Sequence, residues 1–253
     1  MKIVKNLSLI LGILIISVFY SCKKSSNKPA PPTPPPANLM AYWPLNNNAA
    51  DKSRYGNNGV AFNTTAVADR FGNANSALHF DGTTSYIAVP DSVGLRLANT
   101  DFTVNAWVKL DSYNSYYASA IISKRLTGAN NGWLWAINGQ GNTPLGAVYF
   151  GPGGGNPDAI GTTVLSTGTW YMVTCVYNLA QQTLSIYVNG SLDHTATGIL
   201  PANPAIATAL FIGKDEVGPN NDQYYFHGTL DEIRIYNTAL DATTITQLYT
   251  AAN

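Results

Sequence analysis

The sequence predicts an all-β fold in which two antiparallel sheets pack face to face and a short helix ends the chain. Many short runs alternate apolar with polar residues and are separated by Gly- or Asn-rich turns, which is the pattern of paired strands. Charged residues make up only 11% of the chain, whereas Gly and Tyr number 22 and 15, a profile unlike that of a helical bundle or a disordered chain. About a dozen such runs with no helix between them favour a two-sheet antiparallel jelly-roll sandwich.

The clearest hairpin is predicted over residues 170–190, WYMVTCVYNLAQQTLSIYVNG. In its first half the odd-numbered residues from Tyr171 to Tyr177 fall on one face of a strand and the even-numbered residues fall on the other. Residues 184–189 alternate in the same way. Asn189-Gly190 then supplies the positive-φ pair of a type I′ turn, which sends the chain back through residues 191–197.

Further strand signals follow one another along the chain, and helical spacing occurs only near its end. Asp241 is suited to cap a helix that carries Ile245, Leu248 and Tyr249 on one face. The remaining predicted strands cover residues 41–45, 77–82, 85–90, 101–110, 120–124, 132–138, 145–150, 209–214 and 228–237.

The first residues resemble the signal peptide of a bacterial lipoprotein. Lys2 and Lys5 precede an apolar run over residues 7–20, which is short for a membrane span and suits a secretory signal. Cys22 follows this run and would become the lipidated first residue of the mature chain. We therefore interpret residues 1–21 as a signal peptide, the alternative being an ordinary signal with an incidental cysteine.

Residues 22–38 are predicted to form a tether. Their PAPPTPPPA run favours polyproline II, which extends by about 3 Å per residue and is semi-rigid. It would hold a domain over residues 39–253 away from a membrane, so we expect an exported protein that is lipid-anchored to the cell envelope, at the outer membrane. Cys175 lies among apolar strand residues and is expected to be buried and unreactive.

Six segments of the chain, taken in order, are AYWPLNNNAADKSRYGNNG, ALHFDGTTSYIAVPDS, FTVNAWVKL, IISK, WYMVTCVYN with LSIYVNG, and YFHGTLDEIRIYNTALDATTITQLY. Together they resemble the LamG-like jelly roll of the concanavalin A-like lectin/glucanase superfamily. The resemblance implies the fold, but it leaves function open, because such domains serve as sugar-binding modules, adhesion modules and appendages of enzymes.

The sequence does not indicate an enzyme. Retaining glycosidases need two carboxyl groups about 5 Å apart, one of them protonated. The chain has two glutamates, Glu216 in a loop and Glu232 in a strand, and Arg234 is placed to pair with the second. Strand alternation predicts that Asp231 and Glu232 face opposite ways, which would prevent a catalytic pair.

Other function classes are excluded by composition and spacing. The formal net charge is zero and basic residues do not cluster in the domain, so nucleic acid binding is not expected. The three histidines, His79, His194 and His227, show no metal-ligand spacing along the sequence.

A structural calcium site is one hypothesis. Asp51 and Asn57 or Asn58 lie in an oxygen-rich loop after the first strand, and Asp231 lies near the start of the last one. Calcium prefers such carboxylate and amide oxygens, and members of the resembled family often bind it. The alternative is a loop in which Asp51 bonds its own backbone. A competing loop contains Asp215, Glu216, Asn220, Asn221 and Asp222.

A carbohydrate site is the second hypothesis, since sugars stack their apolar C–H faces on aromatic rings. Tyr113, Tyr116 and Tyr117 lie in a predicted loop, where packing explains aromatic residues less readily than in strands. Trp133 and Trp135 share one face of a strand and are either a sugar platform or part of the core. A second pair of loop tyrosines is Tyr224 and Tyr225.

These observations predict a non-catalytic cell-envelope lipoprotein whose LamG-like domain binds a glycan or polysaccharide. The alternative is a module for adhesion or scaffolding that binds envelope proteins and no sugar.

Overall fold

The computed structural model of the protein describes residues 36–126, 131–153, 157–200, 207–216 and 224–251. The chain separates into two units, Met1–Thr33 and Pro34–Asn253, and every described residue belongs to the second. The predicted signal peptide, Cys22 and most of the predicted tether lie outside the described residues. In the part that is described, no helix combines the length and the apolar character needed to cross a bilayer.

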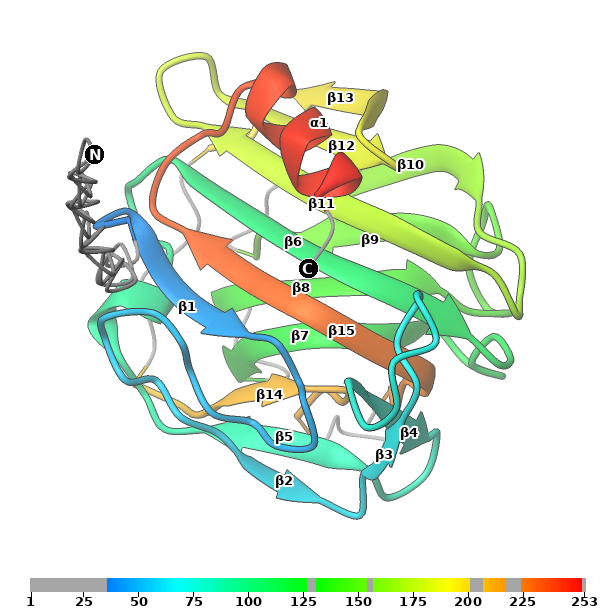
Figure 1. The fold of residues 1–253 in the computed structure, drawn as a ribbon. Helices are drawn as coiled ribbons and strands as arrows, with labels where there is room; N and C mark the ends of the chain where they lie inside the picture. Colours follow the sequence, from blue (N-terminus) through cyan, green and yellow to red (C-terminus); the bar gives the residue numbers. More distant parts are fainter. Residues whose placement is uncertain (1–35, 127–130, 154–156, 201–206, 217–223, 252–253) are drawn as a thin grey trace, which may run out of the picture. The chain divides into compact units, whose positions relative to one another are not determined.

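The predicted fold class is confirmed, because two antiparallel sheets form a sandwich (Figure 1). We name the eight-stranded sheet A and the seven-stranded sheet B. Sheet A has the order β13 (Ser191–Thr197), β12 (Thr183–Val188), β11 (Trp170–Asn178), β6 (Phe102–Leu110), β15 (His227–Tyr236), β4 (Ala77–Asp81) and β3 (Thr65–Val67), and β1 (Leu39–Trp43) also pairs with β15. Sheet B has the order β10 (Ala159–Val164), β9 (Ala147–Gly151), β8 (Asn131–Asn138), β7 (Ala118–Leu126), β14 (Leu210–Ile212), β5 (Tyr86–Val89) and β2 (Val60–Phe62). The helical elements are η1 (Val93–Leu95) and α1 (Ala242–Thr250).

The central hairpin forms as predicted from β11 and β12, with Val173 opposite Val188. Asn189 and Gly190 have φ angles of 50° and 79°, which the type I′ turn requires. The side-chain Oδ1 of Asn189 accepts a hydrogen bond from the backbone N–H of Met172 at 2.9 Å. This contact ties the turn between β12 and β13 to strand β11, and so fixes the register of the β11–β12 hairpin.

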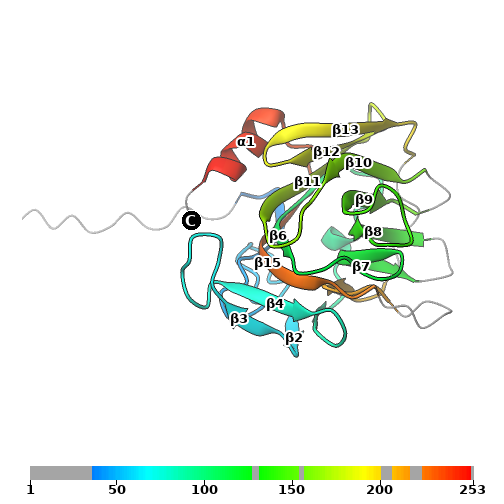
Figure 2. The same ribbon diagram turned by 90° about the vertical axis from the view of Figure 1, so that its right-hand side faces the viewer.

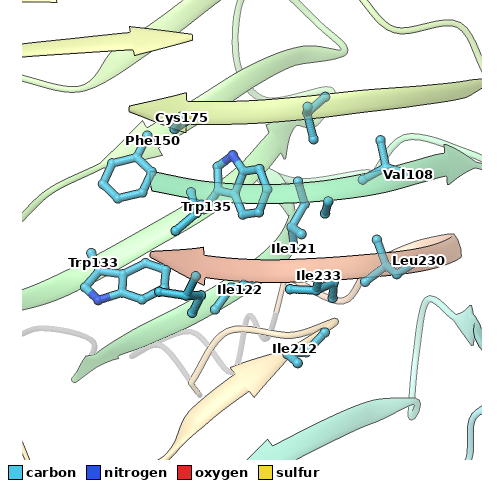
Figure 3. Close-up of a cluster of buried hydrophobic side chains, with 14 of the residues drawn as sticks. Val108, Ile121, Ile122, Trp133, Trp135, Phe150, Cys175, Ile212, Leu230 and Ile233 are labelled. Atoms are coloured by element: carbon cyan, nitrogen blue, oxygen red, sulfur yellow. The ribbon is translucent and has the colours of Figure 1, made fainter. Parts of the chain in front are cut away.

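One apolar core fills the space between the sheets (Figure 3). Trp133 and Trp135 of β8 are 1% and 0% exposed, and Trp133 stacks on Phe150 with the ring centroids 5.9 Å apart. Cys175 is buried there as predicted, and burial raises the pKa of its thiol, which stays protonated. The prediction that the Trp133/Trp135 face binds sugar is wrong, because both side chains point between the sheets, where no ligand can stack on them.

Helix α1 begins where the sequence predicts, with the backbone N–H of Thr244 donating to Asp241 Oδ1 at 2.7 Å. Its buried residue, Ile245, packs on Trp107 and Met172 from the outer face of sheet A. Figure 2 shows the helix outside the sandwich, beside β11, β12 and β13. Part of the outer face of sheet A is therefore covered by the chain itself.

Strand β15 contains a β-bulge that changes where its acidic side chains point. Asp231 pairs with Trp107 of β6, but the next pair joins Arg234 to Asn105, so β15 holds one extra residue between them. Glu232 has a φ of 55°, which non-glycine residues rarely adopt. The prediction that Asp231 and Glu232 face opposite ways is wrong, because this extra residue brings both side chains to one polar pocket on the outer face.

Strands β2, β3 and β10 lie where no strand was predicted, and each is the last strand at one edge of its sheet. Val60–Phe62 is exposed at every position, so it shows no alternation of buried and exposed residues. Hydrophobic periodicity cannot reveal such a strand, because only the pairing with β5 defines it.

Candidate functional site

The outer face of sheet B carries the candidate site. Because alternate residues of β8 fill the core, the residues between them point outwards, and they meet small residues of β7. Three tyrosines, Tyr117, Tyr149 and Tyr224, pack on this layer, and we name them the tyrosine cluster. The fully buried side chains of the layer are Ala118, Ala120, Leu134 and Ala136.

Tyr117 holds the tyrosine cluster together. Its ring meets the ring of Tyr149 edge-on, with centroids 5.7 Å apart, and lies tilted against Tyr224 at the same separation. The backbone positions Tyr117 from the β8 side, since the N–H of Gly139 donates to its carbonyl oxygen at 2.8 Å. Tyr149 is buried, whereas Tyr117 and Tyr224 are partly exposed, so the latter two rings are the ones that a ligand can reach.

The three tyrosines predicted as a ligand-binding group have different surroundings. Tyr116, the residue before Tyr117 in the chain, is 61% exposed, and its backbone N–H donates to Asn114 Oδ1 at 2.8 Å. Tyr117 belongs to the cluster itself. Tyr113 instead packs against the core, and its hydroxyl donates to the carbonyl oxygen of Leu165 at 2.9 Å. The structure therefore keeps Tyr116 and Tyr117 as candidates for ligand contact and assigns Tyr113 to packing.

Charged groups stand beside the tyrosine cluster. Arg125 Nε donates to Asp215 Oδ2 at 3.0 Å, and Asp215 is fully buried. Burial lowers the pKa of Arg125, but hydrogen bonding to Asp215 and the charges of Asp215, Tyr149 and Tyr224 together raise it above its ordinary value. Burial raises the pKa of Asp158, which also takes part in a hydrogen bond with Tyr149. The face thus combines aromatic rings with a guanidinium group, a carboxyl group and tyrosine hydroxyls.

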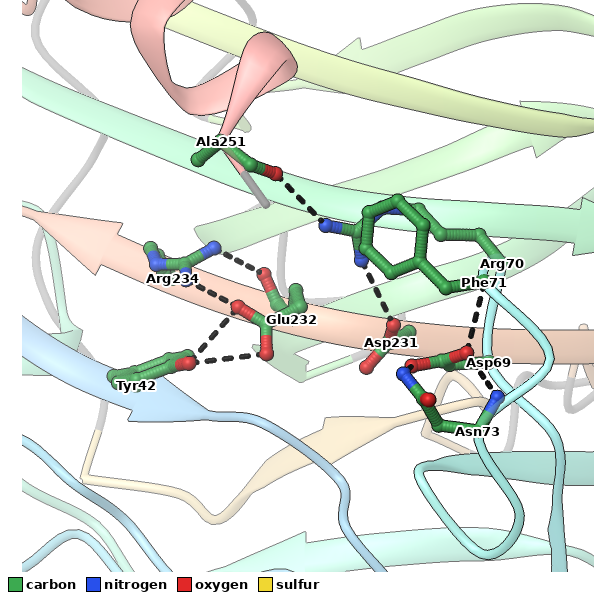
Figure 4. Close-up of polar contacts among 9 residues, drawn as sticks. All are labelled: Tyr42, Asp69, Arg70, Phe71, Asn73, Asp231, Glu232, Arg234 and Ala251. Carbon is green, nitrogen blue, oxygen red and sulfur yellow. Dashed lines mark hydrogen bonds and ion pairs between the residues drawn. The ribbon is translucent and has the colours of Figure 1, made fainter. Parts of the chain in front are cut away.

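A polar network occupies the outer face of sheet A (Figure 4). The Arg70 guanidinium lies between the rings of Phe71 and Trp107, each 4.3 Å from its Cζ, and donates to Asp231 Oδ2 at 3.2 Å. It also donates to the carbonyl oxygen of Ala251 at 3.4 Å, beyond the last turn of α1. These contacts join the loop after β3 to β15 and to the end of the helix.

Asp231 and Glu232 both belong to this network. A glycosidase also uses two neighbouring carboxyl groups, so the surroundings of this pair decide whether it resembles a catalytic pair. Burial, followed by the charge of Glu232, raises the pKa of Asp231 from 3.8 to about 7, against the opposing effect of Arg70. The side chains of Asp231 and Glu232 are only 3% and 5% exposed. Glu232 also accepts a hydrogen bond from Tyr42 and pairs with Arg234. Three of the four carboxyl oxygens therefore bond to neighbouring side chains, and Asp231 Oδ1 has no partner among the described residues.

The carboxylates proposed for calcium are bound to other groups in the structure. Both oxygens of Asp51 accept hydrogen bonds, Oδ1 from the N–H groups of Tyr42 and Ser53 and Oδ2 from the Ser53 hydroxyl and the N–H of Asn57, at 2.7–2.9 Å. Asp231 pairs instead with Arg70. The geometry agrees with the alternative of a loop closed by Asp51, and calcium binding stays a prediction that melting with and without EGTA tests.

The competing acidic loop is described only in part. Asp215 is held by Arg125, and Asn220, Asn221 and Asp222 lie outside the described residues. One group of metal-ligand type was missed from the sequence, since His79 and His227 meet at Asp111. Only the pairing of β4 with β15 brings the two histidines together, so their spacing along the chain gives no signal.

The sandwich with its aromatic outer face defines a jelly-roll domain of the lectin-like class. A family model described as the concanavalin A-like lectin/glucanases superfamily matches residues 81–246, well over half of the chain. The chain belongs to this family, as its six segments suggested.

Solved structures with the same fold include carbohydrate-binding domains. Domain 4 of AbnA, an extracellular arabinanase from Geobacillus stearothermophilus in complex with arabinotriose, is 21% identical with a TM-score of 0.65, covering 84% of this chain and 98% of that one. A candidate carbohydrate-binding protein from Bacteroides ovatus is 24% identical with a TM-score of 0.57, covering 70% and 47%. The binding domain of Paraclostridial Mosquitocidal Protein 1 is 16% identical with a TM-score of 0.64, covering 84% and 52%. No curated protein sequence matches the chain.

Proposed function

We propose that the protein is a non-catalytic, cell-envelope lipoprotein whose jelly-roll domain binds a glycan on the outer face of sheet B. The observation that carries this proposal is the tyrosine cluster, with the exposed Tyr116 next to Tyr117 in the chain and with Arg125 and Asp158 close by. Aromatic rings stack on the C–H faces of sugars, while carboxylate and guanidinium groups bond their hydroxyls. The arabinotriose bound to a domain of the same fold supports this class of ligand.

The absence of catalysis is part of the proposal. A glycosidase needs an acid and a second carboxylate that both reach the scissile bond. Asp231 has the raised pKa of an acid, but it and Glu232 are buried and engaged by Arg70, Tyr42 and Arg234. We expect purified protein to release no reducing ends from any polysaccharide that it binds.

A polysaccharide panel tests the binding proposal by affinity electrophoresis of the chain from Pro34 onwards, which contains the whole sandwich. Tyr116→Ala removes an exposed ring, so we expect it to leave the melting temperature unchanged and to weaken binding by about fivefold, or roughly 1 kcal/mol. Tyr55→Ala removes an exposed tyrosine of the loop after β1 and serves as the matched control. If the best ligand retards Tyr116→Ala as strongly as it retards Tyr55→Ala, the glycan site does not include Tyr116 and lies elsewhere.

Tyr117 allows a finer comparison. Tyr117→Phe keeps the ring that packs on Tyr149 and Tyr224, whereas Tyr117→Ala removes it. We expect the Phe variant to bind nearly as well as the wild type if stacking dominates. If no polysaccharide is retained by the wild type, and an envelope protein is captured whose binding Tyr116→Ala abolishes, the adhesion alternative replaces the glycan proposal.

The lipid anchor is tested separately. We expect mass spectrometry of protein from its native membrane to find Cys22 as an acylated N-terminus, and Cys22→Ala to release the domain from the membrane. If the mature chain is unmodified and begins at another residue, the domain is exported but is not anchored through Cys22.

A further inference from the structure

Three side chains of metal-ligand type meet on the outer face of sheet A. His79 lies on β4, His227 is the first residue of β15, and Asp111 directly follows β6. His79 Nε2 is 2.9 Å from Asp111 Oδ2, and His227 Nε2 is 4.0 Å from the same oxygen. One ligand atom from each residue lies within 4.8 Å of the other two.

The sheet itself fixes these three positions. His79 stands opposite Thr229 and His227 stands opposite Asp81, so the two histidines project from the same face of neighbouring antiparallel strands. Their rings meet edge-on with the centroids 6.2 Å apart. The backbone N–H of Asp111 donates to the carbonyl oxygen of His227 at 2.9 Å, which holds the carboxylate beside the rings. Backbone pairing thus aligns the three side chains before any ion arrives.

We propose that His79, Asp111 and His227 bind a divalent transition-metal ion, with zinc as the best match. Imidazole nitrogen and carboxylate oxygen are the usual ligands of zinc, and three protein ligands leave a fourth position for water. Ligand atoms about 2.1 Å from a tetrahedral zinc ion lie roughly 3.4 Å from one another. The distances of 2.9 and 4.0 Å to Asp111 Oδ2 fall on either side of this value, so rotations of the side chains suffice.

A second layer of contacts favours the ligating orientation of His227. Its Nδ1 is 2.8 Å from Ser112 Oγ, and an Nδ1–H donated to that oxygen leaves the Nε2 lone pair facing Asp111. Gly82 packs directly on this histidine, since a Cβ at that glycine would lie 2.8 Å from the His227 Cβ. Lys109, the nearby cation on β6, directs its ammonium group to the Trp170 ring at 5.3 Å.

The test is isothermal titration of zinc into tag-free protein, from Pro34 onwards, together with cobalt absorption spectra that report tetrahedral coordination. We expect one saturable site per chain. His79→Gln, Asp111→Asn and His227→Gln each remove a ligand and should weaken binding by more than the roughly 10- to 100-fold that changes around metal ligands cost. Ser112→Ala changes only a contact of His227, so it should weaken zinc binding by roughly 10- to 100-fold. His194→Gln changes the one histidine outside the group and should bind as the wild type does.

Because the three side chains are 30–40% exposed, the variants are expected to keep the fold, which circular dichroism verifies. Zinc should raise the melting temperature of the wild type and of His194→Gln equally, that of Ser112→Ala by less, and that of the three ligand variants least. The proposal is overturned if zinc does not saturate a single site, or if any of the three ligand variants binds like the wild type. A loss of glycan binding in Tyr116→Ala leaves this result untouched, so the two proposals fail independently.

Discussion

Replacing Asp231 by asparagine should change how the stability of the domain depends on pH. Its carboxyl group has its pKa raised from 3.8 to about 7, first by burial and then by the charge of Glu232. Between pH 3.8 and about pH 7, the Asp231 carboxyl group is therefore protonated in the folded protein but ionised in the unfolded chain. The stability that this proton contributes is complete below pH 3.8 and is lost as the pH rises through about 7.

The magnitude follows from the size of the pKa shift. Each pKa unit corresponds to about 1.4 kcal/mol, so between about pH 5 and pH 8 the raised pKa removes at most about 3 kcal/mol from the free energy of unfolding. Asparagine has the shape of the neutral acid and does not titrate. We expect Asp231→Asn to match the wild type closely near pH 5 and to exceed its stability by about 2 to 3 kcal/mol near pH 8.

Urea denaturation at both pH values measures this effect, and the difference between variant and wild type cancels the other titrating groups. Asp241→Asn is the matched control, because hydrogen bonds from Thr244 lower the pKa of that exposed carboxyl group below the tested range. The difference in the free energy of unfolding between Asp241→Asn and the wild type should be the same at both pH values. If the Asp231→Asn difference is also constant, the carboxyl group is ionised throughout and the reasoning from burial is refuted.

Three further substitutions have effects that denaturant unfolding can measure. Trp135→Ala should cost about 3 to 5 kcal/mol, because the side chain is fully buried between the sheets, and a cost below about 1 kcal/mol would contradict that placement. Asp215→Ala leaves Arg125 without its partner, so a loss of about 3 to 5 kcal/mol is expected, whereas an unchanged midpoint would show the pair to be solvated. Asp241→Ala removes the cap of α1 and should cost about 1 kcal/mol, with the loss of helical signal limited to that helix.

The sequence was sufficient for the parts of the fold that repeat a local pattern. Alternation identified β11 and β12, and the Asn189-Gly190 pair identified the turn from β12 to β13, because each depends on neighbouring residues alone. The cap at Asp241 was equally local. The exposed edge strand Val60–Phe62 was missed, since it is defined only by its partner strand.

The candidate sites depended on long-range contacts and were predicted less well. Trp133 and Trp135 share a face, but only the second sheet decides that this face is the inner one. The bulge at Glu232 reversed the expected direction of one carboxylate, and no residue type demands a positive φ at that position. The loop position of Tyr116 was predicted correctly, because the stretch around it has no apolar alternation to explain an aromatic residue as part of a strand.

The two outer faces of the sandwich explain why the ligand is assigned to sheet B. Helix α1 and the Arg70 network cover part of the outer face of sheet A, and their polar atoms largely bond to one another. On sheet B, the tyrosine cluster lies over small buried residues, and the exposed Tyr116 directly precedes Tyr117 in the chain. A glycan that binds this domain should therefore contact sheet B.

Amide chemical shifts recorded while the best oligosaccharide is added test this claim most directly. We predict that the largest changes fall on β7, β8 and β9 and on the residues around Tyr116 and Tyr117, with those around Trp107 and Asp231 unmoved. Changes centred on the outer face of sheet A would contradict the account, as would a saturating sugar that leaves the tyrosine cluster unperturbed.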